Sequence, residues 1–148
     1  MVTISSLKLK FELLDTNKII QDSLVETMPA FEQANKDQLR GGINNKGESI
    51  LPRYKSQKYA DFKQSLNEFP GNGVPDLFLT GEFYRLIDAE VGKDVIDIIS
   101  KDDKGPELEN KYPDIFGLGK NFKNEYLQHS LKPTVQEKIT TFTGLKFQ

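Results

Sequence analysis

The residue types that most often carry chemistry in proteins are sparse in this chain. It has no cysteine and a single histidine, His129, and no second histidine is present to share a metal ion with it. We therefore interpret His129 as an ordinary surface or packing residue, and we expect no metal site and no cofactor. Glu82 and its acidic neighbours could form a glycosidase-type pair, but a chain with 22 acidic residues offers many accidental pairs.

Three motifs that mark ligand-binding or catalytic loops are missing. The acidic run from Asp94 to Glu107 lacks the spacing of a calcium loop, because Gly105 is followed at once by Pro106 and Glu107. Neither the glycine-rich phosphate loop nor the Gly-x-Ser-x-Gly nucleophile turn occurs. We name no catalytic residue and expect a protein that is not an enzyme.

Residues 52–69 mix cations with aromatic side chains. Such a segment could bind nucleic acid, because cations contact phosphates while rings stack on bases. It also suits an ordinary surface, since Lys and Arg stems cover apolar groups while their charges stay in water. Asp61 and the net charge of −2 favour this structural interpretation. The residues that would contact nucleic acid are Arg53, Lys55, Lys58 and Lys63.

The composition indicates one ordinary domain. The chain has 148 residues, enough for a single hydrophobic core, and its 20 basic and 22 acidic residues nearly cancel. The N-terminus has no apolar run of signal-peptide length, and nowhere do about 18 apolar residues follow one another. We expect a protein that is neither secreted nor membrane-spanning.

Helical periodicity dominates the first forty residues. Apolar residues at helical spacing predict a short helix over residues 7–14. After Asp15 and Thr16, either of which can cap a helix, a second amphipathic pattern runs to Gly41. Pro29 interrupts this pattern, and we expect a kink or two helices that meet near Met28.

The middle of the chain predicts turns and then a hairpin. Residues 41–52 have the Asn and Gly content of a tight reversal, and residues 52–69 predict a partly helical insertion with its own aromatic cluster. Thr80-Gly81 is a point where the backbone can turn sharply into a sheet. Alternation over residues 83–91 and a β-branched run at 95–99 predict an antiparallel strand pair.

The last part of the chain predicts further helices. Residues 107–112 form one or two helical turns, and a helical pattern runs from residue 120 to 131 before Pro133 breaks it. A second segment follows with Val135, Ile139 and Phe142. The predicted fold is α+β, with a long kinked N-terminal helix and a C-terminal helix packed on a small antiparallel sheet with a central hairpin.

Short motifs occur in residues 37–40, 42–54, 59–60, 76–84 and 108–118, among them the run Leu79-Thr80-Gly81-Glu82-Phe83-Tyr84. They resemble small structural proteins of tailed bacteriophages, of the tail-completion, head–tail connector (neck) or minor tail type. The related pattern there has a Gly-Ile-Asp-x-x-Gly turn, a Tyr-Ser-x-x-Tyr step and a Leu-Thr-Gly-Asp-Phe-Tyr entry into a strand pair. This chain departs from it at Asn44, where Asp is usual, and at Lys55, where Ser follows the Tyr.

The resemblance implies a non-enzymatic virion protein at the head–tail junction or tail, made in the host cytoplasm and acting through subunit interfaces. It implies a homo-oligomeric ring that contacts other virion proteins of the neck or tail, close to DNA, with no membrane and no small-molecule substrate. The domain then spans residues 1–132, and residues 133–148 form a C-terminal arm that docks on a partner. The expected interface residues are Phe83, Tyr84, Ile87, Val135, Ile139 and Phe142. The alternative is a nucleic-acid-binding module that uses the aromatic-basic residues 53–63.

Overall fold

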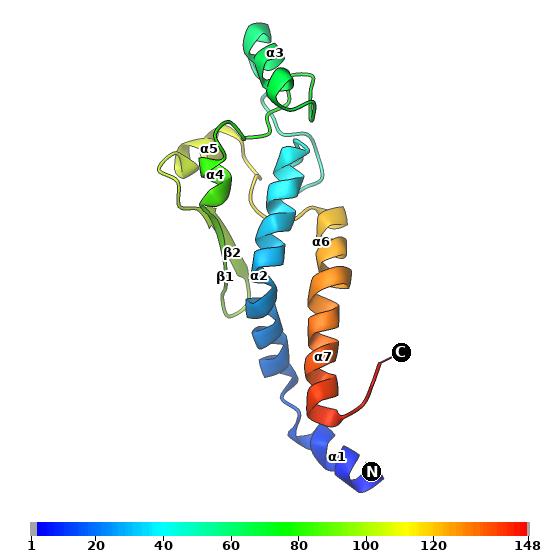
Figure 1. The fold of residues 1–148 in the computed structure, drawn as a ribbon. Coiled ribbons are helices and arrows are strands. Elements are labelled where there is room, and N and C mark those ends of the chain that lie inside the picture. Colours follow the sequence, from blue (N-terminus) through cyan, green and yellow to red (C-terminus); the bar gives the residue numbers. More distant parts are fainter. Residues whose placement is uncertain (1–2, 148) are drawn as a thin grey trace.

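The computed structural model describes residues 3–147 and shows an α+β fold built along one long helix. Helix α2 and the α6–α7 run lie side by side, and the β-hairpin lies on another flank of α2 (Figure 1). Helices α1 and α3 lie at opposite ends of the molecule. The elements in chain order are α1 (Ile4–Leu13), α2 (Thr16–Arg40), α3 (Gln57–Leu66), α4 (Glu82–Arg85), β1 (Ile87–Val91), β2 (Ile96–Ser100), α5 (Gly105–Lys111), α6 (Lys120–Tyr126), the π-helical turn η1 (Leu127–Leu131) and α7 (Lys132–Thr143).

Helix α2 begins and ends where its sequence predicts. The Asp15 side chain accepts a hydrogen bond from the Lys18 N–H at 2.9 Å and caps the first turn, and Gly41 follows the last. Of the two outcomes expected at Pro29, the meeting of two helices near Met28 is wrong, because α2 is one helix that continues through Pro29. A kink there stays a prediction. Proline removes the bond to the carbonyl four residues earlier, at Val25. Both residues are exposed, so water can satisfy that carbonyl.

The hairpin pairs β1 with β2 in antiparallel register, from Ile87 opposite Ser100 to Val91 opposite Ile96. Its predicted start at Phe83 is wrong, because Phe83 and Tyr84 lie in the helical turn α4. Both of these neighbouring side chains are buried, whereas successive side chains of a strand point to opposite faces. Gly81, at φ 85°, turns the chain into this helical turn instead.

Two apolar clusters lie along α2. One surrounds the last turn of α2 and includes residues from α4, β1 and the segments around residues 50 and 112–115: Leu39, Ile50, Phe83, Tyr84, Ile87, Tyr112 and Ile115. The other lies midway and joins α2, β1 and α6 through Met28, Phe31, Ala89 and Tyr126. The hydroxyl groups of Thr27 and Tyr126 hydrogen-bond at 2.8 Å beside it, so the buried phenol has its polar partner.

The C-terminal helices form one continuous run, and the break predicted at Pro133 is wrong. Proline normally clashes with the carbonyl one turn earlier, but the π-helical turn η1 directly precedes it and changes the bonding there. The Thr134 hydroxyl donates to the Ser130 carbonyl at 2.9 Å. The predicted domain boundary between residues 132 and 133 therefore lies inside a helical run. Docking of residues 133–148 on a partner stays a prediction, and residue 148 lies outside the described residues.

Candidate functional site

Three of the predicted interface residues lie in the core. Phe83, Tyr84 and Ile87 are only 7%, 5% and 3% exposed, and all three belong to the cluster around the end of α2. Exposing them to a partner would open that core, so their assignment as interface residues is corrected. The apolar pattern over residues 83–91, which led to this assignment, reflects burial within the chain.

The other predicted interface residues lie on α7. Val135 and Ile139 are half-buried and Phe142 is exposed. Helix α7 packs along α2, where the Lys138 ammonium group contacts the Glu26 carboxylate at 2.6 Å. Only Phe142 of this set is therefore free enough to contribute a large contact to another molecule.

Helix α1 carries an apolar surface that periodicity alone did not reveal. Leu7 and Phe11 form one pair at i, i+4 spacing, and Leu9 and Leu13 form a second pair offset by two residues, which places it on the opposite face. Helix α1 packs against α7, where Leu7 is half-buried and Phe11 stays 49% exposed. Leu9 and Leu13 remain 56% and 66% exposed, and no residue of α1 is buried. We call Leu9 and Leu13 the α1 surface.

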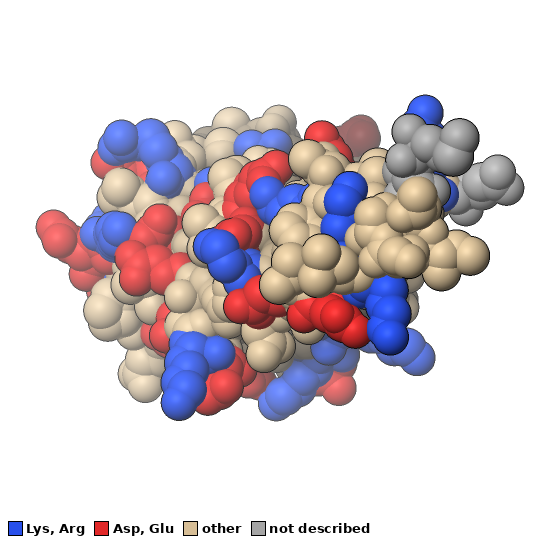
Figure 2. Space-filling view, turned by 90° about the horizontal axis from the view of Figure 1, so that it is seen from below, with Lys and Arg blue, Asp and Glu red and all other residues tan. Residues whose placement is uncertain are grey.

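Charges of both signs are mixed at the α1 end of the molecule. Figure 2 views the molecule from this end and shows basic and acidic side chains interspersed over most of the face, with an uncharged area at its right-hand side. The C-terminal segment adds exposed Leu145 and Phe147. The α1 end therefore carries more exposed apolar side chains than one helix alone provides.

Lys63 does not belong to an accessible basic patch. Its side chain is buried, and its ammonium group lies 2.8 Å from a carboxylate oxygen of Asp76 and donates to the Phe78 carbonyl. Buried charges are retained only with such partners. The assignment of Lys63 to nucleic-acid contact is therefore wrong, whereas Arg53, Lys55 and Lys58 are exposed.

Asp76 is the centre of this buried polar cluster. Its carboxylate also accepts a hydrogen bond from the Phe78 N–H at 3.1 Å, and its carbonyl accepts the Tyr84 hydroxyl. Burial, and then the Asp76 carboxylate, raise the pKa of the Tyr84 and Tyr54 hydroxyl groups well above the ordinary tyrosine value. These tyrosines remain protonated donors at neutral pH. The cluster ties α3 and its flanking loops to the rest of the domain.

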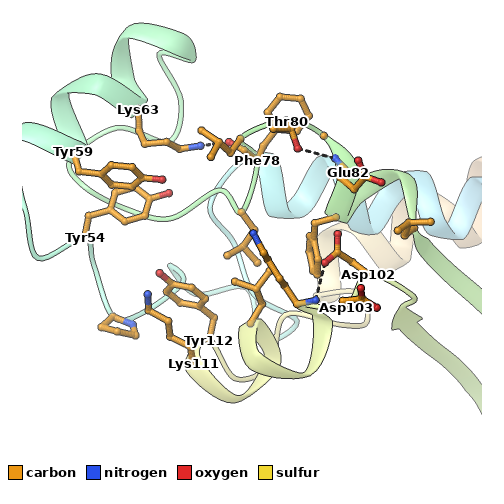
Figure 3. Close-up of a pocket in the computed structure, with 18 of the residues that line it drawn as sticks. Tyr54, Tyr59, Lys63, Phe78, Thr80, Glu82, Asp102, Asp103, Lys111 and Tyr112 are labelled. Atoms are coloured by element: carbon orange, nitrogen blue, oxygen red, sulfur yellow. Dashed lines mark hydrogen bonds between the residues drawn. The ribbon is translucent and has the colours of Figure 1, made fainter.

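A cleft of about 950 Å³ lies between α3 and α5 (Figure 3). One wall comes from residues 52–56 with Tyr59 and Lys63, and the other from residues 101–104 with α5 and Tyr112. Residues 77–83 form its floor between the walls. The rings of Tyr54 and Tyr59 point their hydroxyl ends toward the cleft, and Lys111 and Tyr112 face them from the other wall. We call this hollow the α3 cleft.

The α3 cleft brings together cations that are far apart in sequence. Arg53 and Lys55 line one wall, and Lys101, Lys104 and Lys111 line the other. Lys101 is paired with Asp88 at 2.5 Å, outside the cleft lining. Lys58 is exposed but does not line the cleft.

The acids of the α3 cleft are partly compensated. Glu82 accepts the Arg85 guanidinium at 2.6 Å, and Asp102 accepts the Lys104 backbone N–H at 2.7 Å. Asp103 is the third acid of the lining. The lining holds the exposed Arg53 and four exposed lysines, one of which (Lys101) is paired with Asp88, so the charge balance of the walls is positive.

The sequence contains a pattern that links α5 to the aromatic-basic residues 53–63. Lysine stands next to tyrosine at Tyr54-Lys55, Lys58-Tyr59 and Lys111-Tyr112, and all three tyrosines line the cleft. Distance along the chain hides the third pair, because only folding places α5 opposite residues 52–59.

Metal binding and membrane crossing find no support in residues 3–147. Within them, no group of three or more His, Cys, Asp and Glu side chains is arranged to hold a metal ion. His129 is exposed on the π-helical turn. None of the helices described is long and apolar enough to cross a membrane.

The segments that carry the phage resemblance gather at the α3 end of α2. Asn45 donates from its side-chain amide to the Phe116 carbonyl at 2.7 Å, and Gln38 accepts the Gly119 N–H at 2.7 Å. Asn44 accepts two backbone N–H groups at 3.0 Å through the side-chain oxygen that an Asp would also offer. The residues of these motifs therefore form turns and core contacts of the domain. No family model, curated protein or solved structure matches the chain.

Proposed function

We propose that this chain is a non-enzymatic structural subunit of a tailed-bacteriophage virion, at the head–tail junction or in the tail, that acts through contacts between copies. The α1 surface is the observation that supports contacts between copies, and the motif resemblance alone supports the virion role. A helix with apolar side chains on two opposite faces needs cover on both, and α7 covers only part of one, because Leu7 is half-buried while Phe11 stays 49% exposed. A neighbouring copy supplies the other.

The length of α1 strengthens this argument. Isolated helices shorter than about 12 to 15 residues are marginal in water, and most helical stability in proteins comes from packing. Helix α1 has 10 residues, none of them buried. Packing of Leu9 and Leu13 against a second copy stabilises this helix as well as the assembly.

The edge of β2 that faces away from β1 is a second candidate for contacts between copies. On β1, the Ala89 N–H points away from β2 and donates to the Glu32 carboxylate of α2 at 2.9 Å, so this edge is covered. Strand β2 is the other edge of a two-stranded sheet. Open strand edges are common sites of sheet extension between chains.

The mass of the purified protein tests the proposal. We expect a defined multiple of the chain mass by light scattering or native mass spectrometry, and a closed ring by electron microscopy. Leu9→Gln/Leu13→Gln keeps good helix formers while removing the apolar pair, and should give monomers. Lys8→Gln/Glu12→Gln changes two exposed residues of the same helix and should keep the multiple.

Two results would overturn it. If the wild-type protein stays monomeric at every concentration, it does not assemble and the proposal is wrong. If Leu9→Gln/Leu13→Gln forms the same multiple as the wild type, the α1 surface is not the contact between copies. The virion location has a separate readout, which is mass spectrometry of phage particles purified from a producing culture. Peptides of this chain should be present there, and their absence would contradict that location.

A further inference from the structure

We propose that the α3 cleft binds a short stretch of single-stranded nucleic acid, with tyrosine rings stacking on bases and the cations of both walls contacting phosphates. This inference goes beyond the structural role and does not depend on the oligomeric state. The α3 cleft and the α1 surface lie at opposite ends of the molecule, so each can be altered without touching the other (Figure 1).

The aromatic part of the cleft is built for stacking rather than closed packing. The Tyr54 and Tyr59 rings meet edge to face, with centroids 5.0 Å apart and planes at 89°. A perpendicular pair cannot cover both faces of both rings, and Tyr59 is exposed. A base can stack on an exposed aromatic face whatever its identity, because every base has a π face.

The cations lie where a backbone passing the rings would run. Lys55 stands on the same wall as Tyr54 and Tyr59, and Lys104 stands on the facing wall. Both side chains are exposed, and their ammonium groups form no salt bridge within residues 3–147. A phosphate backbone in the cleft therefore gains contacts without breaking an existing ion pair.

The combination of rings and cations favours a single strand over other anions. In a duplex the bases are stacked on one another and cannot lie on Tyr59. The carboxylates of an acidic peptide would use Lys55 and Lys104 but would gain no stacking from the rings. A single strand offers bases and phosphates at once, as both sets of residues require.

Fluorescence anisotropy with a labelled oligothymidylate over a salt series tests the site. Binding should weaken as salt rises, and Lys55→Gln/Lys104→Gln should reduce the slope of log affinity against log salt by about 1 for each lysine. Tyr59→Leu should weaken binding by about tenfold or more, and Tyr59→Phe should retain it. Lys120→Gln/Lys123→Gln, on exposed residues of α6 outside the cleft lining, should change nothing.

Competition arms separate the alternatives. Duplex of the same sequence, heparin, polyglutamate and thymidine monophosphate should all compete less well than unlabelled oligothymidylate. No binding at low salt, or an equal loss in the Lys120/Lys123 control, overturns the proposal. Equal competition by heparin or polyglutamate with no effect of Tyr59→Leu would reduce the cleft to a general anion surface. Equal competition by thymidine monophosphate would make it a free-nucleotide site.

Discussion

Replacing Lys63 by Met should destabilise the protein more than any exposed lysine change, because it leaves the buried Asp76 carboxylate without its counter-ion. The two groups are 2.8 Å apart, and both side chains are less than 9% exposed. At an effective dielectric constant of about 20, two unit charges at that distance attract by roughly 6 kcal/mol. Desolvation of both ions offsets most of this attraction, so the net contribution of the intact pair is small.

Removing only one member of the Lys63–Asp76 pair should cost much more than the intact pair contributes. A buried pair broken on one side costs about 3–5 kcal/mol, since the remaining ion stays desolvated. Asp76 keeps the Phe78 N–H and a long contact of 3.4 Å to the Asn67 amide, which places the expected loss for Lys63→Met near 3 kcal/mol. A typical domain has only about 5–15 kcal/mol of stability, so this loss is large.

Urea unfolding followed by circular dichroism measures this loss, and hydrogen exchange over residues 57–66 shows whether α3 opens first. The double variant Lys63→Met/Asp76→Asn should recover part of the loss, because neither buried charge remains. Lys58→Met on the same helix is the matched control, and it should change stability by less than about 0.5 kcal/mol. A loss below about 1 kcal/mol in Lys63→Met, or no recovery in the double variant, would refute the reasoning.

Two further predictions concern buried polar groups. Gln38→Leu leaves the Gly119 N–H buried without its acceptor, so the free energy of unfolding should fall by about 1–3 kcal/mol, whereas exposed Gln33→Leu should cost less than about 0.5 kcal/mol in the same urea titration. Burial raises the pKa of Tyr84, so above about pH 10 the native state holds a proton that the unfolded chain loses. The contribution of Tyr84 to stability should therefore be constant below about pH 10 and fall as the pH rises beyond it. The free energy of unfolding of Tyr84→Phe should fall less steeply over that range, and identical slopes would contradict the raised pKa of Tyr84.

Local signals predicted most of the elements correctly. The capping residue Asp15 and the terminating Gly41 bound the long helix, and the β-branched run at 95–99 is the return strand within about one residue at each end. The insertion at residues 52–69 is helical in its centre and carries the expected aromatic cluster. These features depend on neighbours within a few residues, so they can be read from the sequence.

The errors arose where distant segments decide the outcome. Lys63 looked like its exposed neighbours Lys55 and Lys58, and only the approach of Asp76 makes its burial possible. Phe83 began an apparent alternating strand, and the core around the end of α2 buries it together with Tyr84 in a helical turn.

The sequence by itself determined an α+β chain with a long amphipathic helix, a hairpin and an aromatic-basic insertion, because periodicity, caps and turn residues act locally. Tertiary structure alone decided which cations are free and which surfaces are uncovered. It placed Lys104 across a cleft from Lys55, and it half-buried Leu7 of α1 while leaving Leu9 and Leu13 in solvent. The physical reason is that burial and charge pairing depend on distances in space, which the spacing of residues along a chain does not specify.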